Sequence, residues 1–338
     1  MIRILNPRIL RANFKYVRNI HHDTIMRNDN IECAEEVQIP VPWGHVSGKW
    51  WGPKDVRPIL GLHGWQDNAG TFDTLAPLLP KHVGLLSIDL PGHGFSSRLP
   101  DGMFYSAIDN IHVIRTIMKE YNWEKVSIMA HSMSSIIGFI FAGLFPDKID
   151  MLIGLDALKP HIRPVSSIPK TLAKRFENFL IADERNRSKE EPPSYLYEEC
   201  IEKLHIGTFK SVDRDKCLHL LDRNIQKSSK YPDKYFFTRD SRMKCYNYGT
   251  FFQDLCLDVA KRITTPYCFI KANSSSYYED EKYFHETVEV LKQNPHFYLH
   301  RVDGTHHVHL NEPEKVSGII NDFINKYRKP EGLHQAKL

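Results

Sequence analysis

Ser132 is the residue of this sequence best placed to act as a nucleophile. It follows a short apolar run at 126–130 that breaks at His131, and a second apolar segment begins at Met133. A strand, a sharp turn and a helix in this order hold a serine hydroxyl at the tip of the turn. Because that hydroxyl attacks a carbonyl carbon only when a base accepts its proton, the sequence must also provide the base.

His306 is the base that we predict, since it lies after the last expected strand and two residues after the turn glycine Gly304. Imidazole titrates near neutral pH, which suits proton transfer to and from a hydroxyl. Two more histidines follow, His307 and His309, and we interpret them as packing or polar-surface residues. Neighbouring histidines also occur in metal sites, but no acidic or cysteine partner lies at metal-ligand spacing. We therefore predict no metal and no cofactor.

The carboxylate that orients His306 has two candidate positions. Many folds with this layout place it after the penultimate strand, where the first acids here are Glu279 and Asp280. Asp156 ends the strand that follows the helix after Ser132, and from there a carboxylate can reach the same imidazole. We favour Asp156, because His306 would otherwise lack an orienting acid. The alternative is that Asp156 caps a helix or lies at the hinge of an inserted segment.

Attack on an ester or amide also requires two N–H donors aimed at the oxygen on which negative charge develops. One donor is the backbone N–H that follows the nucleophile, here that of Met133. The other comes from the loop after an earlier strand, where Trp65 follows His63 and Gly64. We therefore predict an oxyanion hole made by the Trp65 and Met133 amides.

Strands and helices alternate through most of the sequence, which predicts an α/β fold with a mainly parallel sheet covered by helices on both faces. The expected strands are 36–41, 45–50, 57–62, 83–88, 126–129, 151–155, 267–270 and 297–302, and the expected helices are 72–79, 108–118, 133–144, 281–292 and 316–327.

The alternation stops between residues 160 and 261, where charged residues, tyrosine and serine are frequent. Because a structureless loop of this length is uncommon in a compact domain, we predict an inserted helical lid at 160–261. The core would then comprise 35–159 and 262–328, with an N-terminal basic arm at 1–34 and a tail at 329–338. One large domain with an insertion and two separate domains fit the length equally well.

The composition is ordinary for a soluble globular protein: 338 residues, of which 41% are hydrophobic and 25% charged. Five positive charges lie within residues 1–18, before the first acid, so the remainder of the chain is close to neutral and gives no reason to expect nucleic acid as a partner.

Six scattered cysteines without a Cys-x-x-Cys pair predict reduced thiols in an intracellular compartment. No apolar run reaches the roughly 20 residues of a membrane-spanning helix, so no integral span is expected.

Both ends of the chain resemble targeting signals. The arm is rich in arginine and poor in acids, with apolar residues along one helical face, as in a mitochondrial presequence; a disordered basic tail is the alternative. The last three residues, Ala336, Lys337 and Leu338, are a conservative variant of the Ser-Lys-Leu peroxisomal signal. We predict peroxisomal localisation through the import receptor, with the cytoplasm or mitochondrion as alternatives.

Two sets of ordered motifs, spread over roughly residues 35–327, resemble known families. The first resembles the α/β-hydrolase superfamily and the second the serine hydrolase-like (kraken-type) family within it. The superfamily motifs are His63-Gly64-Trp65-Gln66-Asp67-Asn68, Asp89-Leu90-Pro91-Gly92-His93-Gly94, His131-Ser132-Met133 and Gly304-Thr305-His306-His307-Val308-His309. The family motifs are Val41-Pro42-Trp43-Gly44-His45, Trp65-Gln66-Asp67-Asn68, Thr238-Arg239-Asp240 and Val308-His309-Leu310-Asn311-Glu312-Pro313.

The resemblance implies a hydrolase fold, a serine nucleophile, an often undefined substrate and an association with peroxisomes. The position of Asp156 also looks like the haloalkane dehalogenase arrangement. Those enzymes use an aspartate nucleophile where this sequence has Ser132, so halide displacement is disfavoured.

The sequence departs from the superfamily at the turn around Ser132. Ala130, Ser134 and Ser135 stand where glycines are usual, because the strand and helix backbones approach closely there. Alanine and serine are small, so we expect them to fit with slight displacement, and a narrowed pocket or a slower reaction would result.

Taken together, these residues predict a serine hydrolase that cleaves a small ester or thioester through an acyl-enzyme on Ser132. The substrate would be a small acyl compound, and only the peroxisomal signal favours a thioester. The alternative is a non-catalytic or weakly active hydrolase-fold protein that binds a small apolar ligand under its lid.

Overall fold

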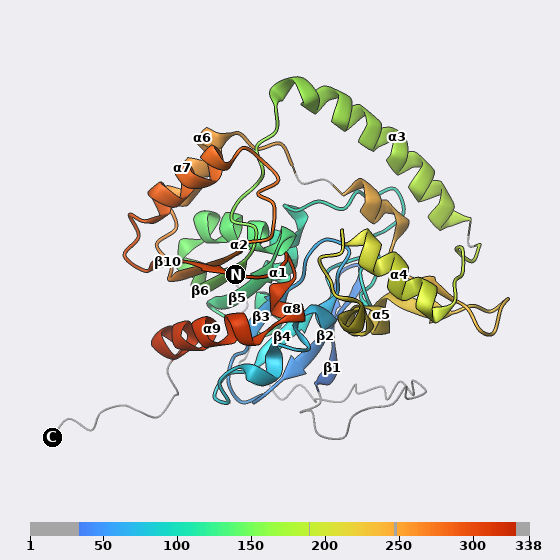
Figure 1. Cartoon of the computed structure of the whole chain (residues 1–338), viewed down its shortest axis with the longest axis horizontal. Helices are drawn as coiled ribbons and strands as arrows, with labels where there is room; N and C mark the ends of the chain where they lie inside the picture. Colours follow the sequence, from blue (N-terminus) through green and yellow to red (C-terminus); the bar gives the residue numbers. More distant parts are fainter. Residues whose placement is uncertain (1–33, 189, 247–248, 329–338) are drawn as a thin grey trace, which may run out of the picture. The chain divides into compact units, whose positions relative to one another are not determined.

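A sheet of eight strands forms the centre of the computed structural model, which describes residues 34–188, 190–246 and 249–328 (Figure 1). The order across the sheet is β1-β2-β4-β3-β5-β6-β9-β10. The pairs β1–β2 and β2–β4 are antiparallel, and all other pairs are parallel. The strands are Glu35–Val41 (β1), Gly44–Trp51 (β2), Ile59–Leu62 (β3), Leu85–Ile88 (β4), Val126–His131 (β5), Ile149–Leu155 (β6), Tyr267–Ala272 (β9) and Phe297–Val302 (β10).

Helices cover both faces of this sheet, as the alternating sequence pattern predicts (Figure 1). One face packs against α1 (Asp109–Glu120), α2 (Met133–Leu144), α6 (Gln253–Lys261) and α7 (Glu281–Leu291). The other face packs against α9 (Glu314–Tyr327) and two short 3₁₀ helices, Ala69–Phe72 and Ala76–Leu78. The predicted fold class is therefore confirmed.

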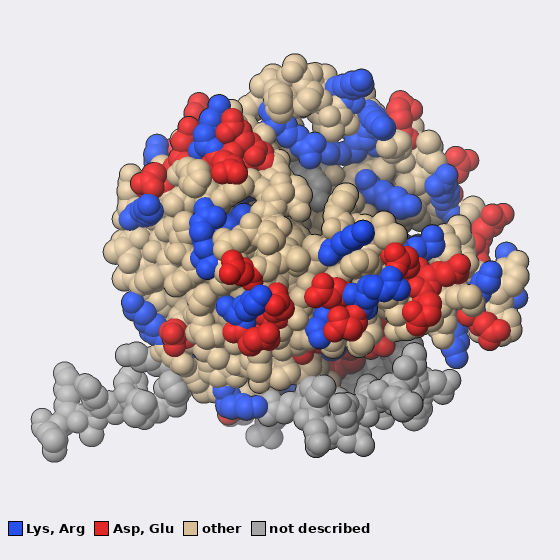
Figure 2. Space-filling model, in the orientation of Figure 1, with Lys and Arg blue, Asp and Glu red and all other residues tan. Residues whose placement is uncertain are grey.

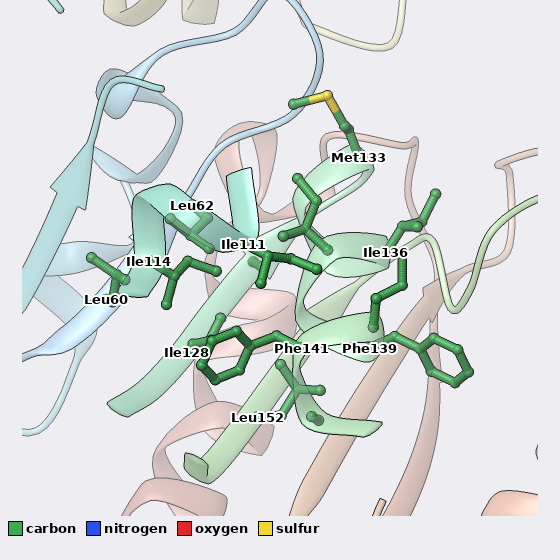
Figure 3. Packing of buried hydrophobic residues seen from close by; sticks show 14 of the residues in the cluster. Leu60, Leu62, Ile111, Ile114, Ile128, Met133, Ile136, Phe139, Phe141 and Leu152 are labelled. Atoms are coloured by element: carbon green, nitrogen blue, oxygen red, sulfur yellow. The ribbon is translucent and has the colours of Figure 1, made fainter. Parts of the chain in front are cut away.

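The central strands are buried on both faces, which explains their nearly continuous apolar sequences. Ile128 of β5 and Leu152 of β6 belong to one apolar cluster with Phe139 and Phe141 of α2 (Figure 3). Met129, the next residue along β5, lies in the cluster on the opposite face of the sheet. Successive side chains of a strand point to opposite faces, so β5 joins the two clusters and holds the loop after it in place.

The segment between β6 and β9 carries helices that extend beyond the sheet (Figure 1). It contains α3 (Ile168–Arg187), α4 (Tyr197–Gly207), α5 (Cys217–Asn224), a small antiparallel pair of strands, β7 (Ile225–Lys227) and β8 (Tyr235–Phe237), and α6. The helix α4 packs on α5, and α5 packs on the 3₁₀ helix Ala69–Phe72 of the core. The last helix, α6, packs on α2 and α7 and so belongs to the layer that covers the sheet.

One expected element differs from the sequence prediction. A single helix at 72–79 is wrong, because the chain forms the two short 3₁₀ helices there. Pro77 lacks the N–H that a continuous α-helix would need at this position. The side chain of Asn68 accepts a hydrogen bond from the N–H of Gly70 and so begins the first of the two.

The two targeting predictions concern residues 1–34 and 329–338, which lie outside the described residues except for Ala34. Within the described residues, no helix is long and apolar enough to cross a lipid bilayer.

Candidate active site

Ser132 lies at a sharp turn between β5 and α2, as the sequence predicts. Its backbone has φ 52° and ψ −119°, a conformation that residues other than glycine rarely adopt. Its N–H donates to the carbonyl of Leu155 at the end of β6, and its carbonyl accepts from Ser135 and Ile136 at the start of α2. These bonds hold the strained residue between two rigid elements.

The residues that replace the usual glycines fit around this turn. Ala130 is fully buried and pairs with Leu62 and Gly154 on the neighbouring strands. Ser134 is also buried, and its hydroxyl donates to the carbonyl of His63, so the added oxygen has a partner. The turn therefore forms with Ala130 and Ser134 in place of glycine.

Glycine is required instead at Gly64, on the loop after β3, where side chains of the turn come close to the backbone. A Cβ atom at Gly64 would lie 2.9 Å from Nδ1 of His131 and 3.3 Å from Cβ of Ser132. The first distance is shorter than real Cβ contacts allow, so this position requires glycine.

Ser132, His306 and Asp156 form a continuous hydrogen-bonded chain. Nε2 of His306 lies 2.8 Å from Oγ of Ser132, and Nδ1 lies 2.5 Å from Oδ2 of Asp156. His306 follows β10 and Asp156 follows β6, so both side chains come from the carboxyl ends of parallel strands. The structure thus brings together the three residues that we predict to be nucleophile, base and orienting acid.

Asp156 is held in its position by more than His306. Its Oδ1 accepts from the ammonium of Lys271 and from the N–H of Ala272, both at 2.8 Å. Burial alone would raise the pKa of Asp156, but the hydrogen bond with His306 and the charge of Lys271 hold this pKa below its ordinary value. Asp156 is thus a carboxylate at neutral pH, with one oxygen fixed by β9 and the other free to orient the imidazole.

Burial lowers the pKa of His306, and the hydrogen bond to Asp156 only partly offsets the effect. The imidazole is therefore neutral near pH 7, with the proton on Nδ1 directed to Asp156 and the lone pair on Nε2 directed to Ser132. This is the state in which a histidine accepts a proton from a serine hydroxyl.

The alternative acids lie elsewhere. Glu279 forms an ion pair with the buried Lys159 at 2.7 Å and accepts from the N–H of Ile162. Asp280 caps α7 by accepting from the N–H of Lys282. Neither carboxylate contacts His306 by hydrogen bond or ion pair within the described residues.

The predicted oxyanion donors come from the start of α2 and from the loop after β3. Met133 is the first residue of α2, and Trp65 follows Gly64, which contacts Ser132 closely. In the described part of the chain, neither backbone N–H donates to another protein group. Trp65 itself is fixed by its indole, which donates to the carbonyl of Met243. Both amides are therefore available to an oxygen of a bound substrate.

Two features of the site lie outside the prediction from sequence. The first is Lys271, which pairs with Asp156. A lysine near the end of an otherwise apolar strand is a signal in the sequence that could have indicated a buried partner for a carboxylate. The second concerns His307 and His309: of the two roles considered for them, packing rather than polar surface is the one observed, since His309 is completely buried and His307 is 6% exposed. Both histidines pack with His131, and Asp67 from the loop after β3 lies among them.

A cavity of about 2020 Å³ opens above Ser132 and is lined by the core and by the segment between β6 and β9. Its lining includes eight Lys and Arg residues and six Asp and Glu residues, so its charge is positive on balance. Figure 2 shows a hollow beneath α3, with Lys and Arg side chains along its rim. The volume exceeds the roughly 300–1,000 Å³ of ordinary small-molecule sites, which leaves room for an extended ligand.

Comparison with known proteins agrees with this geometry. Residues 57–313 match the family model described as the alpha/beta hydrolase fold. The chain is 36% identical to a probable serine hydrolase of Drosophila melanogaster over 86% of this chain and 88% of the relative. It is 29% identical to serine hydrolase-like protein 2 of Homo sapiens, over 86% of this chain and 93% of the relative.

Solved structures show the same fold. A hypothetical protein from Pseudomonas aeruginosa PAO1 superposes with a TM-score of 0.72 at 24% identity, covering 87% of this chain and 99% of that one. The thioesterase domain from the curacin biosynthetic pathway superposes with a TM-score of 0.69 at 18% identity, covering 85% and 99%. The chain therefore belongs to the α/β-hydrolase superfamily and, within it, to the serine hydrolase-like family.

Proposed function

We propose that this protein is a serine hydrolase that cleaves a small ester or thioester through an acyl-enzyme on Ser132. The observation that carries the proposal is the hydrogen-bonded chain from Ser132 through His306 to Asp156, at 2.8 and 2.5 Å. No comparable observation favours the alternative of a non-catalytic binding protein, because the turn forms despite its altered residues.

In the proposed reaction, Oγ of Ser132 attacks the carbonyl carbon while Nε2 of His306 accepts the hydroxyl proton. The carbonyl oxygen becomes an oxyanion, which accepts hydrogen bonds from the Trp65 and Met133 amides. His306 then gives the proton to the leaving alcohol or thiol, and the acyl group remains on Ser132. Water, activated by His306 in the same way, releases the carboxylic acid and restores the serine.

A fluorophosphonate probe tests this proposal directly. We expect the probe to phosphonylate Ser132 with loss of fluoride, and Ser132→Ala to remove the labelling completely. Ser135→Ala, which alters another buried serine one turn along α2, is the matched control and should still be labelled. Absence of labelling in folded wild-type protein, measured by intact-mass spectrometry, would reject the proposed nucleophile.

We further propose that the acyl substrate carries an anionic group outside the scissile bond. In the described part of the chain, six cationic residues that line the cavity form no ion pair with a carboxylate. Arg239 is half-buried and the other five are exposed at the cavity, and together they favour an anionic ligand, which would supply a counter-charge. The six residues are Arg163, Arg185, Lys203, Lys227, Arg239 and Lys244.

Arg239 carries the strongest part of this argument. Burial lowers the pKa of its guanidinium, and no neighbouring carboxylate offsets the effect. A phosphate or carboxylate on the substrate would pair with it in a bidentate manner.

The charge preference is measurable with matched thioesters that carry the same acyl group on a neutral thiol and on the phosphate-bearing coenzyme A. We expect Arg239→Gln to lower kcat/KM for the anionic thioester by about tenfold, because one charged hydrogen bond is lost, and to leave the neutral thioester within about twofold. Lys170→Gln, which removes an exposed charge on α3 outside the cavity lining, is the control. An equal loss for both thioesters would contradict the charge preference while leaving the serine mechanism intact.

A further inference from the structure

Asp67, His131 and His307 converge on one point beside Ser132. Oδ2 of Asp67 lies 3.6 Å from Nδ1 of His131 and 3.4 Å from Nε2 of His307. All three potential ligand atoms lie within 4.8 Å of one another, and all three residues are buried. They come from three separate segments, namely the loop after β3, the end of β5 and the turn before α8 (Val308–Asn311).

The hydrogen bonds of His307 leave a lone pair directed at Asp67. The hydroxyl of Ser211 donates its single proton to the carbonyl of Thr208 at 2.6 Å, so it accepts from Nδ1 of His307 at 2.8 Å. In its neutral form the imidazole then has no proton on Nε2, the atom that faces the Asp67 carboxylate.

The hydrogen bonds of His131 lead to the same result. Nε2 of His131 lies 2.9 Å from the carbonyl of His306, which can only accept, so Nε2 carries the proton. Nδ1 is left with a lone pair directed at Asp67, and within the described residues it is buried without a hydrogen-bond partner. Gly64 lies close to this atom, since a Cβ there would come within 2.9 Å of it.

In these neutral tautomers neither imidazole directs a proton at Asp67, whose Oδ2 accepts from the hydroxyl of Thr71 at 3.1 Å. Three electron-pair donors therefore face one another, and a cation among them would relieve their repulsion. We propose that Asp67, His131 and His307 form a binding site for a divalent transition-metal ion such as Zn²⁺. With metal–ligand bonds of ~2.0–2.1 Å, the corners of a tetrahedron lie about 3.4 Å apart, close to the two separations measured here.

The donor set and its surroundings define the kind of metal. Two imidazole nitrogens and one carboxylate oxygen suit Zn²⁺, Co²⁺ or Ni²⁺, whereas Mg²⁺ and Ca²⁺ prefer oxygen ligands throughout. All three residues line the cavity above Ser132, so an ion can enter from it, and water can complete the coordination.

A metal ion at this site would slow the hydrolysis at Ser132; this consequence rests on the proposed hydrolase function. His131 directly precedes Ser132, and its ring centroid lies 4.6 Å from that of His306. A doubly charged ion there opposes the positive charge that develops on His306 when it accepts the serine proton. We expect saturating Zn²⁺ to slow hydrolysis at least tenfold and a chelator to reverse the effect.

Calorimetric titration of the untagged, metal-free full chain with Zn²⁺ tests the site without reference to activity. Wild type and Ser132→Ala should each bind one ion at this site, whereas His307→Gln and Asp67→Asn should lose it. His285→Gln, on the exposed side of α7, is the control for binding by surface histidines and should behave like wild type. Binding that persists in both site variants, or no binding in wild type, would overturn the proposal.

Co²⁺ provides a second measurement that does not depend on the folding of a variant. We expect wild type to give the intense visible absorption of four-coordinate Co²⁺, and Zn²⁺ to displace it. Only the weak absorption of hexa-aqua Co²⁺ in wild type would reject the site. Because Ser132→Ala keeps the three ligands, loss of fluorophosphonate labelling and loss of metal binding are separate outcomes.

Discussion

Asp156→Asn is expected to lower kcat by about 10³- to 10⁴-fold, the size of effect that follows when the base histidine has the wrong tautomer. Oδ1 of Asp156 is surrounded by two donors, Lys271 and the N–H of Ala272. The amide oxygen of asparagine would take this position, and its NH₂ group would face His306. Nδ1 of His306 would then have to accept, so its proton would move to Nε2, the atom that must receive the serine proton.

Steady-state kinetics with any ester that the wild type hydrolyses measures this effect. Asp280→Asn, which alters one of the two alternative acids, is the control and should stay within about threefold of wild type, because a helix cap contributes only to stability. Near-normal turnover by Asp156→Asn would refute its role as the orienting acid.

Arg223→Met is expected to lower the free energy of unfolding by about 3–5 kcal/mol, the usual effect of removing one partner of a buried ion pair. Arg223 on α5 is 3% exposed, and its guanidinium donates to the carboxylate of Asp89 after β4, which is completely buried. Its other nitrogen pairs with Glu36 on β1. Methionine would fill most of the space of the arginine side chain but would remove the positive charge that pairs with Asp89. The buried carboxylate would then keep only the hydrogen bonds from the N–H groups of Ala69 and Phe95.

Urea unfolding of purified protein, followed by circular dichroism, measures this loss. Arg214→Met removes an exposed ion pair with Glu202 in the same segment, and the change there should be below about 1 kcal/mol. Equal destabilisation by the two variants would contradict the view that Arg223 joins α5 to the core.

Much of the fold follows from local sequence patterns. The parallel strands are short apolar runs, so β5 and β9 could be located to within a few residues, and the periodicity of α9 located that helix equally well. The short 3₁₀ helices at Ala69–Phe72 and Ala76–Leu78 could not be separated from a helix by apolar spacing. Their form depends on Pro77, which cannot donate a backbone hydrogen bond, and on Asn68, whose side chain caps the first of them. Neither effect leaves a periodic pattern in the sequence.

By itself, the sequence determined which residues stand at the carboxyl ends of the strands, and these include Ser132, Asp156 and His306. Parallel strands bring such ends to one edge of a sheet, which is why a linear pattern predicts a common site. Only the tertiary structure decided that Asp156 rather than Glu279 faces His306, because the choice depends on Lys159 holding Glu279 elsewhere.

Only the tertiary structure, too, brought Asp67, His131 and His307 together beside that site. Sequence spacing could not predict this group, since its members lie on segments up to 240 residues apart in the chain. Their lone pairs are directed at one another by hydrogen bonds to the carbonyl of His306 and the hydroxyl of Ser211. Such directions arise from the packing of side chains in three dimensions, and no linear pattern records them.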